Sequence, residues 1–277
     1  MKVWNGTAFV DPSSFKVWNG TAFVDPELYT WNGSGYHKLW PTITDHVEYV
    51  SHAAVSMANS DSSSGLTCPI PSGTNIGDRV FLFLYQASVI GFEPSGWTQL
   101  ISSTRVGPSG TDGTGTGPRY MAIYYRNRDS AWSAPSFTSA ATRVAHTLTL
   151  RRSNPDTQWG TPTVSAVATD WTTSSGFSAS TSSFGTHSGG YLMAPTVWND
   201  DVNLSASGRS LTQDSSELLD DSFVTVNSGS SSGTRRYIGA AVFHGAVDDG
   251  VSAPVSLSFS YNGSSQGGFV AVEQALQ

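Results

Sequence analysis

From residue 47 onward, short runs rich in β-branched and aromatic residues alternate with loops rich in Gly, Ser, Pro and Asn. No stretch carries apolar residues at the 3.6-residue spacing of an amphipathic helix. Short strands separated by turn residues predict an all-β fold, a jelly-roll-like β-sandwich. The predicted strands are 47–57, 79–89, 98–105, 120–126, 143–150, 162–168, 190–198, 222–226, 236–244, 255–261 and 267–273.

Several segments of this region occur twice at nearly constant spacing. Gly77-Asp78 and Gly189-Gly190 each precede an apolar run, and SGWTQL (95–100) matches SGRSLTQ (207–213). PRYMAIYYR (118–126) likewise matches RRYIGAAVF (235–243), and SAPSFT (133–138) matches SAPVSLSF (252–259). We therefore expect residues 45–277 to form one sandwich domain of two related halves that face each other across one core.

The N-terminal segment contains a second kind of repeat. KVWNGTAFVDP occupies residues 2–12 and again 16–26, and a degenerate copy, TWNGSGYHKLW, occupies 30–40. Asn-Gly between β-prone runs favours a two-residue type I′ turn. In that turn Trp4 would pair with Thr7, Val3 with Ala8 and Lys2 with Phe9. Residues 1–44 are thus predicted to be an arm of short β-hairpins.

The aromatic residues of this arm raise the question of what covers them. An isolated hairpin is only marginally stable in water. The rings could pack on one another or on the main domain, or they could be buried against other copies of the chain. Near-identical repeats favour burial against other copies of the chain, which predicts a homo-oligomer and specifically a trimer. The predicted interface residues are Trp4, Phe9, Trp18, Phe23, Trp31 and Tyr36.

Composition excludes several classes of function. Charged residues make up 13% of the chain, and the net charge of −7 with a pI near 5.2 argues against nucleic-acid binding. No apolar run approaches the roughly 20 residues of a membrane span, and Met1-Lys2 does not open a secretory signal. We expect no membrane insertion and no export signal. Cys68 is the single cysteine, which excludes an intrachain disulfide and a Cys-based zinc site.

Candidate catalytic motifs do not have the context that their chemistry requires. The G-x-S-x-G match at 229–233 lies in a low-complexity loop, whereas a nucleophile elbow joins a strand to a helix. Asp45, His46 and Glu48 lie close together but lack the ligands of a metal site. Acidic residues such as Glu93 and Glu217 fall in loops. We predict no enzyme, no catalytic residue, no metal site and no cofactor.

His146 and His244 alternate with apolar neighbours in predicted strands. We expect both to be semi-buried, with their ring nitrogens hydrogen-bonded.

Three tryptophans are candidates for glycan binding. Trp132, Trp159 and Trp171 lie near Ser/Thr/Pro/Asn-rich loops, where we expect them to be exposed. Flat aromatic faces beside polar side chains suit sugar stacking and a protein interface equally well. Trp97, which precedes a strand, is expected to fill the core instead.

The VWNGTAF copies, followed by Gly77-Asp78, PSGWT (94–98) and YYR (124–126), resemble minor tail proteins of long-tailed bacteriophages of actinobacteria. The resemblance covers most of the chain. It implies a virion structural protein of the tail tip or side fibre that is synthesised in the host cytoplasm. Its expected partners are further copies of itself, other tail proteins and a host cell-surface glycan, with no cofactor.

Three alternatives remain open. One is a lectin-like module whose purpose is carbohydrate binding, and another is a decoration protein of the phage head. A cell-wall depolymerase is the weakest of the three, because no pair of carboxylates is placed by the sequence in a groove.

Overall fold

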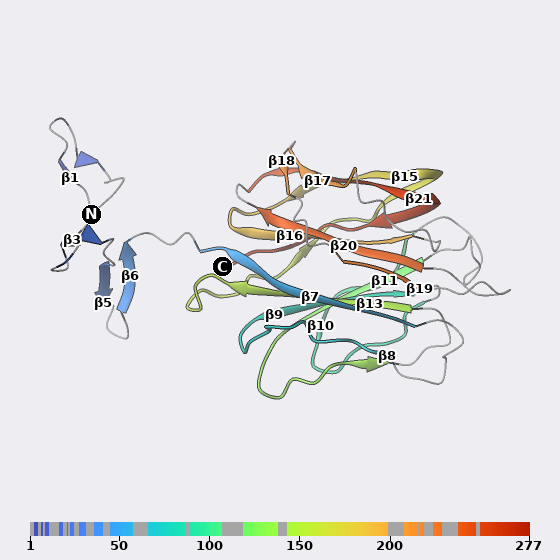
Figure 1. The fold of residues 1–277 in the computed structure, drawn as a ribbon, viewed down its shortest axis with the longest axis horizontal. Helices are drawn as coiled ribbons and strands as arrows, with labels where there is room; N and C mark the ends of the chain where they lie inside the picture. The colour runs from blue at the N-terminus through green and yellow to red at the C-terminus, as the bar shows by residue number, and fades with distance from the viewer. Residues whose placement is uncertain are drawn as a thin grey trace. The chain divides into compact units, whose positions relative to one another are not determined.

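The chain consists of two compact units, Met1–Thr44 and Asp45–Gln277. Every regular element that the structure describes is a β-strand, which confirms the all-β prediction (Figure 1). The structure is a computed structural model. It describes residues 3–4, 7, 9–10, 17–18, 21, 23–24, 28–31, 36–40, 45–57, 66–86, 89–106, 119–137, 143–198, 208–214, 216–218, 224–228, 238–247 and 250–277.

The first unit contains three antiparallel hairpins at the predicted repeats. They are β1 (Val3–Trp4) with β2 (Phe9–Val10), β3 (Val17–Trp18) with β4 (Phe23–Val24), and β5 (Leu28–Trp31) with β6 (Tyr36–Trp40).

The register of these hairpins differs from the prediction. Trp4 pairs with Phe9 rather than with Thr7, so the predicted pairing is wrong. The same register recurs, since Trp18 pairs with Phe23 and Trp31 with Tyr36. This register places two aromatic residues opposite each other, and cross-strand aromatic pairs stabilise a sheet.

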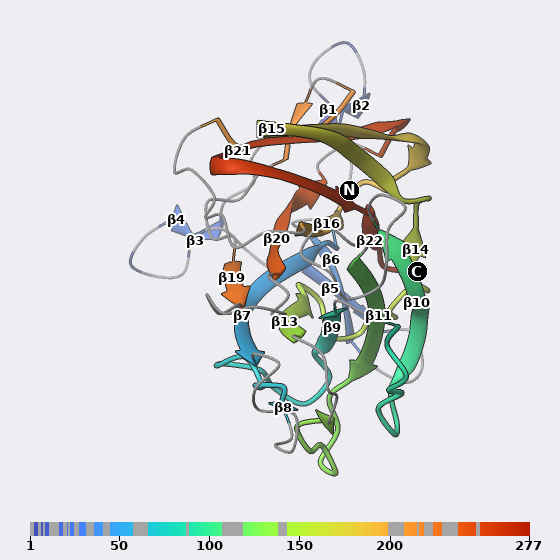
Figure 2. The same ribbon diagram turned by 90° about the vertical axis from the view of Figure 1, so that its right-hand side faces the viewer.

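The second unit contains two large antiparallel sheets, and Figure 2 shows the strands of the first sheet side by side. The first has the order β10 (Thr98–Val106), β11 (Arg119–Asn127), β9 (Arg79–Gln86), β13 (Arg143–Arg152), β7 (Val47–Met57). The second has the order β14 (Thr163–Val164), β22 (Val272–Gln274), β16 (Gly190–Trp198), β21 (Ser252–Phe269), β17 (Ser210–Gln213), β18 (Ser216–Glu217). It also includes β15 (Ala168–Gly185) on β21, and β20 (Ile238–Val247) between β16 and β19 (Val224–Ser228). A separate ribbon joins β8 (Leu66–Thr67) and β12 (Ser136–Phe137).

The main core lies between the two sheets. Phe81, Phe83 and Tyr85 point into it from β9, and Met193 and Val242 point into it from the opposite sheet. Alternate β9 residues join a second cluster, which includes Leu66 and Cys68. A third cluster lies where β15 and β21 cover the other face of β16 and β20. Because β9 and β16 are buried along their whole length, both read as continuous apolar runs.

The two halves of this unit share the order of four of their five strand positions. In the first half the order is β7–β13–β9–β11–β10. In the second half, β14 and β15 correspond to β7, and β22 with the end of β21 corresponds to β13. These strands are followed by β16, β20 and β19, and every pair is antiparallel.

Matching turns support the same correspondence. Gly77 before β9 and Gly189 before β16 have φ of 93° and 74°. Gly96 before β10 and Gly208 before β17 have φ of 77° and 71°. Each pair falls within one of the repeated segments, at a backbone conformation that other residues rarely adopt. One strand departs from the pattern, because β17 pairs with β21 whereas β10 pairs with β11.

Candidate functional site

A pocket of about 310 Å³ lies at one end of the first sheet. It forms where the turn before β9 meets the end of β13 and the loop that follows it. We call it the Arg152 pocket, and its lining residues are Asn75, Ile76, Gly77, Asp78, Arg151, Arg152, Ser153 and Pro155.

Asp78 organises one wall of this pocket. Its carboxylate accepts two hydrogen bonds from Arg151, from Nε at 2.8 Å and from Nη2 at 2.7 Å. The backbone N–H of Asn75 donates a third at 2.7 Å. The hydrogen bond from Arg151 to Asp78 raises the pKa of that guanidinium, so Arg151 stays charged. Asp78 is buried and its charge is fully balanced, which makes it a structural residue.

Arg152 is oriented by neutral groups. Its Nη1 donates to the carbonyl oxygen of Thr157, and its guanidinium lies 5.7 Å from the ring centre of Trp159. The indole Nε1 of Trp159 is itself held at 3.0 Å by the carbonyl oxygen of Gly77. Among the described residues, no carboxylate forms an ion pair with Arg152.

Arg79, a second cation bound by neutral acceptors, lies against the same Trp159 ring as Arg152. Its Nη1 donates to Gly160 O and to Gln274 Oε1, both at 2.6 Å, and its Nε donates to Asn127 Oδ1 at 2.9 Å. The rings of Tyr125 and Trp159 each lie 4.9 Å from the guanidinium. Burial lowers the pKa of Arg79 to about 10, and the positive charge of Arg152 acts in the same direction.

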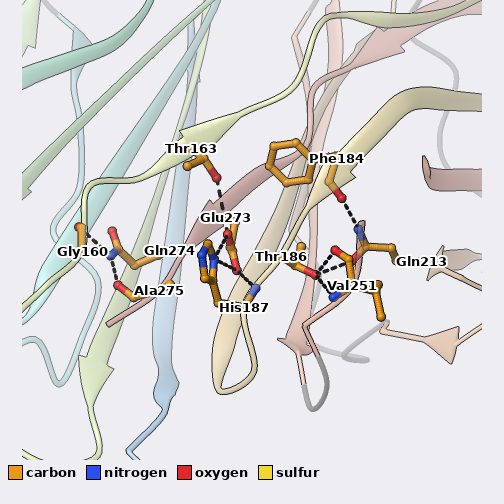
Figure 3. A network of polar contacts seen from close by, with 10 residues as sticks. All are labelled: Gly160, Thr163, Phe184, Thr186, His187, Gln213, Val251, Glu273, Gln274 and Ala275. Atoms are coloured by element: carbon orange, nitrogen blue, oxygen red, sulfur yellow. Dashed lines mark hydrogen bonds and ion pairs between the residues drawn. The ribbon is translucent and has the colours of Figure 1, made fainter. Parts of the chain in front are cut away.

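Gln274 links Arg79 to a further polar network, which Figure 3 shows at close range. The preceding residue, Glu273, has a buried carboxylate that accepts from Nδ1 and the backbone N–H of His187 and from the hydroxyl of Thr163. The His187 ring is exposed, and Glu273 fixes its orientation at 3.0 Å. Neither residue was singled out by sequence reasoning.

The same figure shows how the end of β15 is attached to the sheet. The hydroxyl of Thr186 donates to Gln213 Oε1 at 2.7 Å, and Gln213 Nε2 donates to Phe184 O (Figure 3). Gln213 Nε2 also donates to Ala253 O. These side chains are buried and their hydrogen bonds are satisfied. The role that this geometry supports for them is structural.

The two strand histidines have different environments. His244 is fully buried and lies 2.8 Å through Nδ1 from the hydroxyl of Tyr191, which confirms the expected hydrogen bond. For His146 the expectation is wrong, because neither ring nitrogen has a partner. Burial, with a smaller effect of His52, lowers the pKa of His146 to about 3. His146 lies edge-on to the ring of Tyr85 in a core that holds the neutral imidazole.

The predicted glycan-binding tryptophans have different neighbours and are not brought together. Trp171 on β15 is 54% exposed, as expected. Trp159 is partly buried against the arginines, and Trp132 is partly buried against Trp97 and Arg126, so their expected exposure is wrong. The loops fold back onto guanidinium groups, which attract aromatic faces. Trp97 was expected to fill the core, and this is confirmed in part: it is partly buried and packs against the cluster that includes Leu66 and Cys68.

The six predicted interface residues, Trp4, Phe9, Trp18, Phe23, Trp31 and Tyr36, occupy strand positions of the three hairpins. The surroundings of their side chains lie outside the described part of the chain, so their role stays a prediction.

In the described ranges, no group of three or more His, Cys, Asp or Glu residues could hold a metal ion. His46 pairs with Glu48 at 3.4 Å instead. Within the same ranges, no helix has the length and apolar character needed to cross a membrane.

Comparison of the chain with protein-family models, curated proteins and solved structures finds no match.

Proposed function

We propose that the chain is a structural protein of a bacteriophage tail, at the tip or on a side fibre. In this proposal it assembles as a homotrimer through its N-terminal unit and contributes to attachment to the host surface. The observation that carries the proposal is the threefold repetition of one hairpin register within a compact unit of its own.

Energetics favour assembly of this unit. In two of the three hairpins only two residues of each strand are paired, and a hairpin of that size is unstable alone. Each pairs an aromatic residue with an aromatic residue next to a paired valine couple. Equal spacing of such pairs suits association with equal surfaces of other copies, which adds stability by mass action.

Attachment to a host surface fits the second unit. A sandwich with continuous buried strands is a rigid support for loops, and loops on rigid supports commonly carry binding residues. Three copies would also convert weak binding at one site into avidity of roughly 10²–10⁴-fold.

The first test is the mass of the native assembly, measured by light scattering. For the full chain we expect three times 29.4 kDa, the mass of a trimer. For residues 45–277, which lack the first unit, we expect the mass of a monomer. Circular dichroism and thermal unfolding of the shortened chain provide the control for folding. A folded 45–277 protein that remained trimeric, or a monomeric full chain, would contradict the proposal.

The second test concerns the place of the protein in the particle. Antibodies against residues 45–277 should label the tails of phage particles that carry this protein. Labelling of the heads would favour the decoration-protein alternative instead.

A further inference from the structure

The Arg152 pocket contains positive charge that the described residues do not balance. Arg151 is neutralised by Asp78, but Arg152 has no carboxylate partner in the described part of the chain, nor does the neighbouring Arg79, which is buried and does not line the pocket. Both guanidinium groups lie against the same indole, that of Trp159. The chain as a whole carries a net charge of −7, so this local excess of positive charge differs from the rest of the molecule.

Arg152 still has hydrogen-bond donors to offer. Nη1 is used by Thr157 O, whereas Nε and Nη2 have no acceptor among the described residues. Nη2 lies beside Gly77, a residue of the pocket wall. Because Trp159 and Thr157 hold the guanidinium, binding of an anion would cost little side-chain entropy.

The rim of the pocket is apolar. Ile76 is 72% exposed, an unusual state for a large aliphatic side chain at the edge of a pocket, and Pro155 also lines the pocket. The backbone turn holds Ile76 outward, because Asn75 N–H is bound to Asp78 and Gly77 N–H is bound to the carbonyl oxygen of Arg128. An apolar face on the ligand would cover this side chain.

The geometry points to a binding site for an acidic sugar, whose carboxylate or phosphate group contacts Arg152 while an apolar face of its ring covers Ile76. The volume of about 310 Å³ is at the lower end of the range for small-ligand pockets and fits one sugar unit. This inference rests on the proposed role in host attachment, for which the acidic sugar would be the recognised group.

The experiment is a calorimetric and NMR titration of the full chain with glucuronate, glucose 6-phosphate, inorganic phosphate and glucose. We expect glucuronate or glucose 6-phosphate to bind, more weakly as salt increases, and glucose not to bind. The tighter of the two acidic sugars identifies the acidic group. Amide signals of Gly77 and Ser153 should shift, which locates binding without any substitution.

Substitutions then assign the contacts. Arg152→Gln should weaken binding of the acidic sugar about tenfold or more, because a charge-assisted hydrogen bond is lost. Arg126→Gln is the matched control, since Arg126 pairs with Asp129 at 2.8 Å and does not line the pocket. Ile76→Ser should weaken the acidic sugar several-fold and leave inorganic phosphate unchanged. Should Arg152→Gln not fold, Arg152→Lys keeps the charge but loses the planar fork and should also weaken binding.

Three results would overturn the inference. They are the absence of saturable binding by either acidic sugar, unchanged affinity in folded Arg152→Gln protein, and equal binding of inorganic phosphate and both sugars with no effect of Ile76→Ser. The mass of the unsubstituted assembly separates this inference from the proposed function. An unsubstituted trimer that does not bind acidic sugar contradicts only the pocket, and an unsubstituted monomer that does bind contradicts only the assembly.

Discussion

The two halves of the sandwich share a backbone plan but not their chemistry. Four strand positions follow the same antiparallel order in each half, and the central strand of each half, β9 or β16, begins after a glycine with positive φ. Register assigns the matching positions, since Leu150 pairs with Arg79 in one half and Gln274 pairs with Tyr191 in the other. The backbone requirements of the turns have therefore persisted in both halves.

The charged residues of the pocket belong to the first half alone. By this register Arg79 corresponds to Tyr191, and Asp78 corresponds to Gly190. Likewise, Arg151 and Arg152 correspond to Ala275 and Leu276. The difference teaches that a shared fold does not carry a shared site, because the site depends on side chains at strand ends that the sheet does not constrain.

The largest expected effect concerns how each half fills its core at the end of its central strand. β16 ends at the fully buried Trp198, whereas β9 ends at Gln86. Trp198→Ala should lower the free energy of unfolding by about 3–5 kcal/mol through loss of a large buried ring. Gln86→Ala should cost only about 0.5–1.5 kcal/mol, the value of its hydrogen bond to Val89 O. Urea unfolding of both variants measures the difference, and equal losses would contradict it.

The next effect is acid sensitivity at a matched core position. His146 lies opposite Phe83, and Val270 occupies the corresponding position opposite Pro195 in the second half. The pKa of His146 is about 3 when folded against 6.5 when unfolded, so its neutral form is favoured by folding. The contribution of His146 to the free energy of unfolding is therefore fully present above pH 6.5. It is lost as the pH drops toward 3, and the loss is about 3 kcal/mol at pH 4.

His146→Val places in the first half the residue type that Val270 provides at the corresponding position of the second half. The variant should not lose stability between pH 7 and pH 4 through this position. The check is the free energy of unfolding at pH 7 and pH 4 for the original and the variant. An identical change with pH in the two proteins would show that His146 does not contribute.

The smallest effect distinguishes the two matching turn glycines. A Cβ on Gly189 would lie 2.7 Å from the carbonyl oxygen of Asp45, whereas on Gly77 its nearest neighbour is the guanidinium of Arg152 at 3.6 Å. Gly189→Ala should cost about 2–3 kcal/mol, from the positive φ and the backbone clash together. Gly77→Ala should cost about 1 kcal/mol from φ alone. Thermal unfolding of the two variants compares them, and a greater loss at Gly77 would refute the argument.

Local patterns were sufficient for much of the fold. Alternating β-prone runs predicted the five strands of the first sheet but not the short β8 and β12, and repeated turn segments predicted two related halves. β15 was missed beyond its first residue, because a Ser/Thr-rich segment reads as loop. Its inward positions, among them Phe177 and Ala179, alternate with exposed serines, and this alternation was the signal that could have identified it.

The amino-acid sequence by itself determined the β class, the repeated halves and the existence of three hairpins, because alternation and turn residues act over a few positions. Tertiary structure decided the hairpin register, the unpartnered state of His146 and the Arg152 pocket. Register depends on which residues pair across a turn, and the partners of a buried imidazole come from other strands. Arg152 and Trp159 meet Gly77 only after β9 and β13 pair, which no local pattern encodes.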